Sequence, residues 1–292
     1  MAAKPCVKWA GGKTQLLPEL SKFYPAKGSF SGYHEPFVGG GAVFFDLASR
    51  GLLEDVECHL SDDCGDLVCV YQVVRDNLKQ LLGRLRKLED GHCKDPKSHY
   101  YAVRAESPTN PVDRAAHFIY LNKTCFNGLY RVNRQGKFNT PMGSYKNPTI
   151  CDEDNLRACS EVLATARIHR EDFGLCAKRL GQGDFVYFDP PYLPASKTAR
   201  FTGYTRGSFG MDEHKRLVDV IRRADAAGAM VLLSSSDSPE TRKLYEGLFK
   251  GLFDGGVLMT SVQARRNINR DTSKRGTVGE IIVSNPRLRE HR

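Results

Sequence analysis

The residues best suited to chemistry are Asp189-Pro190-Pro191-Tyr192, which follow the apolar run 185–188. Such a run predicts a buried strand, and open α/β sheets bind ligands at the carboxyl edge of their strands. The prolines remove two backbone donors, so Asp189 and a proline carbonyl can accept both hydrogens of an aromatic amino group. Accepting them aims the nitrogen lone pair at an electrophile. Tyr192 offers a face on which a flipped base can stack.

A glycine turn could hold the ligand that carries the electrophile. Gly39-Gly40-Gly41 follows the apolar run 33–38 and opens a helix-competent stretch, so a ligand could approach the backbone at a helix N-terminus. The dinucleotide pattern needs a third small residue where this chain has Phe44. This weakens a diphosphate interpretation and leaves open an adenosine ligand without phosphate, or a purely structural turn.

Two adjacent acids, Asp62 and Asp63, end the next predicted strand, 56–60, about twenty residues beyond the glycines. A carboxylate at that strand end can accept hydrogen bonds from both ribose hydroxyls. One of the two could instead cap the following helix. The sequence leaves open which acid would hold a ribose.

Lys13 lies in a Gly12-Lys13-Thr14 tripeptide that resembles part of a phosphate-binding loop. That motif needs a glycine where this chain has Val7, and no strand precedes it. An alternative is that Lys13 binds a carboxylate, with Trp9 nearby.

Basic residues exceed acidic ones, 43 against 34, for a net charge of +9, which suits a polyanionic partner. The surplus is concentrated. Residues 260–292 hold eight basic and three acidic side chains, and residues 121–147 hold five basic and no acidic ones: Lys123, Arg131, Arg134, Lys137 and Lys146. Charge alone is equally compatible with a solvated basic face.

The nine cysteines are unevenly spaced, without the Cys and His spacing of a zinc site, so we expect free thiols, a reducing cytoplasm and no metal. No apolar run approaches the ~20 residues that span a bilayer, and the N-terminus lacks a signal-peptide core. We therefore expect no membrane association.

The elements that would position these residues alternate between strand and helix. Strands are predicted over 33–38, 56–60, 185–188, 229–234, 256–262 and 280–284, and helical patterns over 42–49, 66–88, 97–105, 112–122, 211–227 and 239–249. This predicts an α/β fold with a parallel sheet. A helical and loop-rich segment interrupts it, and residues 123–150 within that segment read as an ordered loop or hairpin. The expected divisions are 1–65 and 166–292 for the core and 66–165 for the insertion.

Together these segments resemble the DNA adenine-N6 methyltransferase family of the Dam type, in the D12 class, over nearly the whole chain. The matching segments are KWAGGK (8–13), EPFVGGG (35–41), LSD (60–62), LNKTCFNGLYR (121–131), GKFNTP (136–141), YFDPPY (187–192) and LSSSD (233–237). Their order matches the subgroup whose target-recognition segment lies between the cofactor loop and the catalytic tetrad.

The resemblance implies a Rossmann-like S-adenosylmethionine-dependent methyltransferase core with an inserted, mainly helical target-recognition domain. It implies methyl transfer from S-adenosylmethionine to N6 of a flipped adenine in double-stranded DNA, within GATC. Asp189, Pro190, Pro191 and Tyr192 would form the catalytic turn. The implied cofactor-binding residues are Trp9, Lys13, Glu35, Phe37, Gly39, Gly41, Asp62 and Asp189.

The implied DNA-binding residues are Lys8, Phe126, Asn127, Leu129, Arg131, Asn133, Lys137, Asn139, Pro141 and Lys146. An Arg forking onto guanine O6 and N7 is the expected use of Arg131, while Lys137, Lys146 and the basic tail would contact phosphates. The chain departs from the enteric enzymes at Cys125, at Phe126, where they carry Tyr, and at Tyr130, where they carry Cys. These departures lie in the reading element and bear on the GATC target.

Two rivals stay open at this point. A cytosine-N4, RNA or protein-amide methyltransferase would share the acceptor turn, and a catalytically silent DNA-binding protein would bind DNA without a cofactor. The Asp at position 189 and the 127–131 segment favour DNA adenine. A palindromic site can be methylated one strand at a time, so we expect a monomer.

Overall fold

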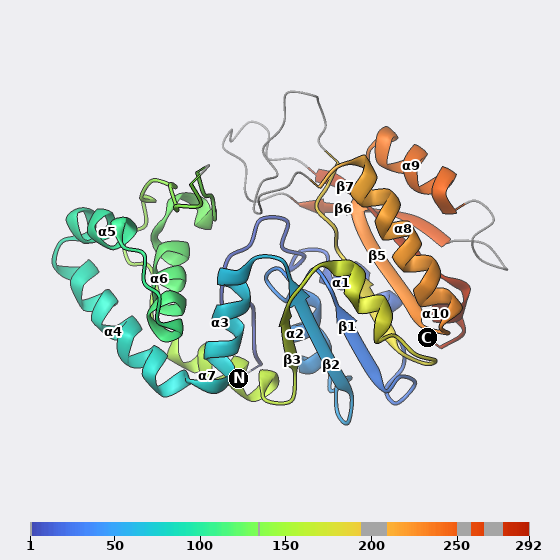
Figure 1. Ribbon diagram of the computed structural model, residues 1–292, viewed down its shortest axis with the longest axis horizontal. Coiled ribbons are helices and arrows are strands. Elements are labelled where there is room, and N and C mark those ends of the chain that lie inside the picture. Colours follow the sequence, from blue (N-terminus) through green and yellow to red (C-terminus); the bar gives the residue numbers. More distant parts are fainter. Residues whose placement is uncertain (1, 134, 194–208, 250–257, 266–276, 292) are drawn as a thin grey trace.

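The computed structural model describes residues 2–133, 135–193, 209–249, 258–265 and 277–291. Its centre is a seven-stranded sheet of order β3-β2-β1-β4-β5-β7-β6 (Figure 1). The strands are β1 (Gly32–Glu35), β2 (Glu57–Asp62), β3 (Arg167–Arg170), β4 (Phe185–Phe188), β5 (Met230–Ser236), β6 (Leu258–Arg265) and β7 (Thr277–Ser284). Strands β1 to β5 pair in parallel, and β7 runs antiparallel between β5 and β6.

Helices cover both faces of this sheet, as the alternating strand–helix pattern predicted (Figure 1). They are α1 (Leu17–Leu20), η1 (Ser21–Phe23), α2 (Ala42–Ser49), α3 (Gly65–Asp76), α4 (Leu78–Lys94), α5 (Pro96–Ala105), α6 (Pro111–Thr124), η2 (Phe126–Gly128), α7 (Glu153–Leu163), η3 (Phe173–Lys178), α8 (Met211–Ala226), α9 (Pro239–Phe249) and α10 (Pro286–Glu290). In β4, Phe185 and Tyr187 pack with the cluster of α1, α2 and α3, whereas Val186 and Phe188 pack with η3 and α8. The two-residue period of the strand thus divides the core into two layers.

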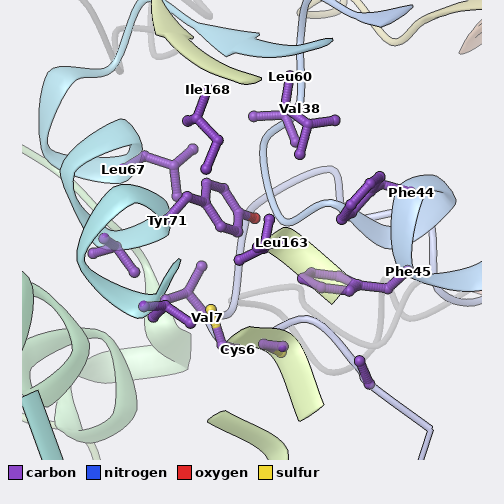
Figure 2. Close-up of a cluster of buried hydrophobic side chains, with 14 of the residues drawn as sticks. Cys6, Val7, Val38, Phe44, Phe45, Leu60, Leu67, Tyr71, Leu163 and Ile168 are labelled. Carbon is purple, nitrogen blue, oxygen red and sulfur yellow. The ribbon is translucent and has the colours of Figure 1, made fainter. Parts of the chain in front are cut away.

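One of these layers lies directly behind the glycine turn. Figure 2 shows Phe44 and Phe45 of α2 facing Leu67 and Tyr71 of α3, with Leu60 and Ile168 from the sheet above them. The Tyr71 hydroxyl donates to the Gly39 carbonyl oxygen at 2.7 Å. The core therefore holds the turn by a buried hydrogen bond as well as by packing.

The helices after β2 form two groups. α3 packs against β2 and β3, and α7 packs against α3 and α2. α4, α5 and α6 contact one another and extend away from the sheet, with residues 125–150 beside them (Figure 1). α3 therefore lies against the sheet, α7 lies against α2 and α3, and α4, α5 and α6 form a group of their own.

The structure differs from the predicted elements in a few places. The helical pattern 66–88 is two helices, which separate at Asn77 with φ −133° and ψ 29°. Neither α7 nor β3 was predicted. Ser235 and Ser236 lie beyond the predicted strand 229–234 but belong to β5, where they pair with β7. Burial by β7 extends the strand beyond its apolar run.

All nine cysteines are free thiols, seven of them buried, as expected. No group of three or more His, Cys, Asp or Glu side chains among the described residues could hold a metal ion. In the same part of the chain, no helix is long and apolar enough to cross a membrane.

Candidate active site

The predicted turn begins where β4 ends, at the carboxyl edge of the sheet. Asp189 Oδ1 accepts hydrogen bonds from Lys13 Nζ at 2.7 Å and from Ser234 Oγ at 3.3 Å. Ser234 lies on the neighbouring strand β5, and its hydroxyl is 2.6 Å from the Tyr187 hydroxyl. Groups from the N-terminal segment and from β5 therefore fix the carboxylate of Asp189.

Lys13 is the centre of a buried polar network. Its side chain is 5% exposed, and its ammonium donates to Asp189, to the Tyr192 hydroxyl at 2.8 Å and to the Gly11 carbonyl at 3.0 Å. Tyr192 in turn donates to Glu280 Oε1 of β7 at 2.5 Å. One ammonium thus lies between two carboxylates and orients the tyrosine of the turn.

The charges of this network depend on one another. Burial alone would lower the pKa of Lys13, but Asp189, Tyr192 and Glu280 raise it above its ordinary value. Burial raises the pKa of Asp189, and Lys13 opposes that shift. Lys13 therefore keeps its proton at neutral pH, and its charge stabilises the ionised form of Asp189.

The glycine turn lies at the end of β1. Gly39 and Gly41 have φ values of 46° and 69°, which favour glycine. A Cβ on Gly39 would lie 2.8 Å from Cδ1 of Trp9. The turn is therefore a close approach between backbone and an indole ring, and α2 begins directly after it.

Asp62, at the end of β2, is tied to this turn. Its Oδ2 accepts from the Gly39 N–H at 3.1 Å and its Oδ1 from the Cys64 N–H at 2.9 Å. Burial raises its pKa to about 6, although the hydrogen bonds from Cys64 and Gly39 oppose that shift. Asp63 is exposed.

Trp9 connects this edge of the sheet to the insertion. Its ring stacks on Tyr130 and Phe118, with centroids 5.9 and 6.4 Å away. The Tyr130 hydroxyl donates to Asp66 Oδ2 at 2.8 Å. The tyrosine that marks a departure from the enteric enzymes is therefore a packing partner of the predicted cofactor tryptophan.

Two further predicted cofactor residues, Glu35 and Phe37, have partners inside the protein. Glu35 is 2% exposed, and its carboxylate accepts from Tyr33 at 2.6 Å and from the backbone of Phe44. Burial raises the pKa of Glu35 to about 8. Phe37 stacks on Phe173, with centroids 5.1 Å apart. Glu35 therefore stabilises the start of α2 from inside the core.

The predicted hairpin is present. Antiparallel bridges join Cys125 to Met142 and Val132 to Phe138. Arg131 donates from Nε to Asn139 Oδ1 at 2.6 Å and from Nη2 to the Asn139 carbonyl at 3.1 Å. Asn139, itself a predicted DNA-binding residue, therefore holds the Arg131 guanidinium within the hairpin.

The other predicted DNA-binding residues differ in exposure. Asn127 adopts φ 54°, and Phe126 is 40% exposed. Asn133 accepts from the N–H groups of Gln135 and Lys137, so its side chain closes the hairpin turn. Leu129 and Lys8 are half-buried, whereas Lys137, Pro141 and Lys146 are exposed. Arg134 and part of the basic tail lie outside the described residues.

Sequence reasoning did not predict the contacts of three polar residues in this region. They are Glu280, which bonds to Tyr192, Ser234, which bonds to Asp189, and Asn122 of α6. Asn122 is 2% exposed and bonds to the backbone of Lys8 and Gly128. The one available signal was an acid or amide inside an otherwise apolar stretch. That signal names no partner.

A doubly wound sheet of this order, with Asp189-Pro190-Pro191-Tyr192 at its carboxyl edge, is the arrangement expected of a Rossmann-like methyltransferase. Residues 9–264 match the family described as D12 class N6 adenine-specific DNA methyltransferase. The chain belongs to this family, and it is an enzyme that methylates adenine in DNA. The predicted family, fold class and activity are confirmed, and the cytosine, RNA, protein and silent alternatives are not retained.

Three relatives align with this chain over nearly the whole length of both proteins. The chain is 40% identical over 299 residues to the type II methyltransferase M.MjaIII of Methanocaldococcus jannaschii, covering 98% of this chain and 100% of that protein. It is 36% identical to the type II methyltransferase M1.LlaDCHI of Lactococcus lactis, covering 97% and 95%. It is 31% identical to the DNA adenine methylase of Haemophilus influenzae, covering 96% and 93%.

Proposed function

We propose that the enzyme takes its methyl group from S-adenosylmethionine, bound at the carboxyl edge of the sheet beside the glycine turn, Trp9 and Asp62. The residues fit this ligand. Gly39 and Gly41 leave the backbone of the turn without side chains, and Trp9 supplies an aromatic ring next to it. A carboxylate at the end of β2 suits a ribose. When bound, this cofactor supplies an electrophilic methyl group on a sulfonium.

Asp62 is the proposed ribose ligand, in preference to Asp63. Asp62 accepts the backbone N–H groups of Gly39, Cys64 and Asp63, and an ionised carboxylate has about four acceptor positions, so capacity for a ribose hydroxyl remains. The backbone bonds fix the direction of these positions. Asp63 is exposed and lacks such anchoring in the described part of the chain.

Lys13 has a second proposed part in cofactor binding, through a ligand carboxylate. An ammonium has three donors, and those of Lys13 contact Asp189, Tyr192 and Gly11. Binding a ligand carboxylate therefore requires Lys13 to exchange one of these partners. The exchange would couple cofactor binding to the state of the catalytic turn.

One observation carries the proposed mechanism: the hydrogen bonds that hold Asp189 end on Oδ1. Its Oδ2 has no partner among the described residues, and the side chain is 19% exposed. Oδ2 and the Pro190 carbonyl would accept the two N6 hydrogens of an adenine flipped out of the duplex, stacked on Tyr192. The N6–methyl bond forms as the sulfur–methyl bond breaks, and N6 then loses a proton to solvent.

The proposed substrate is double-stranded DNA, read by residues 126–141 and bound by a monomer, with GATC as the target. The Arg131 fork matches guanine O6 and N7. Phe126 is an exposed apolar side chain that could fill the gap left by a flipped base. The resemblance of residues 121–131 to the reading segment of the Dam-type family supports this target.

Sequencing of modified bases in DNA from cells that express the protein tests the target directly. We expect N6-methyladenine in GATC on both strands, and its absence from cells that express the Asp189→Ala variant. Methylation at another sequence would refute the GATC target alone. A fluorescent base analogue at the target adenine tests flipping, because unstacking raises its emission; unchanged emission on binding would refute it.

A further inference from the structure

Two asparagines hold the N-terminal segment in the same way. Asn155 of α7 accepts from the Lys4 N–H at 2.9 Å and donates to the Lys4 carbonyl at 3.1 Å. Asn122 of α6 accepts from the Lys8 N–H at 2.7 Å and donates to the Lys8 carbonyl at 2.7 Å. Both side chains are buried, 6% and 2% exposed. Each amide therefore acts as a strand partner for one lysine.

Asn122 differs from Asn155 by one additional contact. Its Nδ2 also donates to the carbonyl of Gly128, in the reading hairpin, at 3.0 Å. Gly128 has φ 63°, and a Cβ there would lie 2.5 Å from Cδ of Lys8. Lys8 and the hairpin are thus in direct contact, and one buried amide holds both.

The Lys8 end of this contact leads to the catalytic turn. Trp9 follows Lys8 in the chain, and its carbonyl accepts from the Gly12 N–H at 3.0 Å, which places Lys13 one residue further. Lys13 then binds Asp189. A displacement of Gly128 would therefore reach Asp189 through Asn122 and a short, internally bonded segment.

We propose that Asn122 is a positioning residue that couples recognition of the target sequence to methyl transfer. This inference rests on the proposed function of the hairpin and of Asp189. When the hairpin engages its target, Asn122 transmits the position of Gly128 to Lys8 and so to the Lys13–Asp189 pair. Asn155 anchors the same segment without a hydrogen bond to the hairpin among the described residues. It therefore stabilises the fold and takes no part in the coupling.

The test is the isosteric pair Asn122→Asp and Asn155→Asp. Each change replaces a donor by an acceptor, so the partner carbonyl faces an oxygen; the Lys4 carbonyl still accepts from the Cys159 thiol. In Asn122→Asp this affects Lys8 and Gly128 together, and in Asn155→Asp it affects Lys4 alone. The readout is the single-turnover rate on duplexes that carry the target sequence or one substituted base pair outside the target adenine.

We expect Asn122→Asp to lower the rate on the target duplex by about tenfold or more, because the carbonyls of Lys8 and Gly128 both lose a buried donor. The preference for the target over the substituted duplex should fall by about the same factor. Asn155→Asp should leave the preference at its wild-type value. A purely structural role would lower both rates together and leave the preference intact, which would overturn the proposal.

A second variant covers the case in which Asn122→Asp does not fold. Gly128→Ala keeps Asn122 and pushes Lys8 away from the hairpin, so it should reduce the preference in the same way. A preference equal to wild type in Gly128→Ala would overturn the coupling. The wild-type enzyme in the same assay separates failure of the proposed function from failure of the coupling. If the wild type shows no transfer or no preference, the proposed function fails and the coupling fails with it.

Discussion

The proposed catalytic turn (residues 189–192) and the proposed reading hairpin (residues 125–142) are held in different ways. Asp189 and Tyr192 are fixed by three buried side chains from distant parts of the chain, Lys13, Ser234 and Glu280. The base of the hairpin bonds to α3 and α5 through Tyr130 and Thr140, whereas Arg131 and Asn133 nearer its tip bond to neighbouring hairpin residues. We therefore expect transfer to depend on the whole fold, and reading to depend on local contacts at the tip of the hairpin. Loss of a side chain in the turn or its network should abolish methyl transfer. Loss of a hairpin side chain should only reduce the sequence preference.

The largest effect is expected for Asp189→Ala. It removes the acceptor of the amino hydrogens, so we expect the rate of methyl transfer to fall by at least about 10³-fold. Far-UV circular dichroism should match that of the wild type. Substantial residual transfer would show that the turn does not have the role assigned to it.

Lys13→Met should have the next largest effect, on stability as well as on transfer. It leaves Asp189 and Glu280 without the ammonium between them, and breaking a buried ion pair costs about 3 kcal/mol. Urea unfolding gives the free energy of unfolding. Lys22→Met is the matched control, because its pair with Glu19 is exposed and contributes less than about 1 kcal/mol. Equal losses in both variants would contradict the network.

Arg131→Ala should change preference and not chemistry. The loss of a bidentate contact to guanine corresponds to about 1–3 kcal/mol of discrimination. Arg131→Lys should lose most of the same preference, because it keeps the charge without the fork. Rates on duplexes substituted at each target position measure this. An unchanged target spectrum in either variant would remove Arg131 from base reading.

Lys137→Ala should have the smallest effect. The side chain is exposed in the hairpin turn, and a phosphate contact there contributes affinity without sequence information. The slope of log binding constant against log salt should fall by about one for every DNA sequence tested. Lys87→Ala is the control and should keep the wild-type slope, because this exposed lysine of α4 is not among the predicted DNA-binding residues. The proposed contact fails if the two slopes agree.

The sequence predicted the parts of this molecule that local chemistry determines. The acceptor turn, the glycines and Asp62 follow strands whose apolar runs are readable, so their place at the sheet edge was predictable. Glu280 and Asn122 were not, because their roles arise from pairings between distant residues. Glu280 reaches the turn because β7 pairs with β5 opposite Ser236, and Asn122 reaches Lys8 across 114 positions of the chain. No spacing encodes either contact.

The place of β7 has a consequence for when activity can begin during synthesis. This strand is the last in the sheet to leave the ribosome, yet it lies between β5 and β6 and brings Glu280 to Tyr192. A nascent chain that ends before Thr277 has the reading hairpin and the glycine turn, but an unpaired β5 edge and an incomplete catalytic network. On the proposed roles of these elements, such a chain has the parts that contact DNA before it has the parts that modify it, so the order of translation delays methylation until β7 has been made.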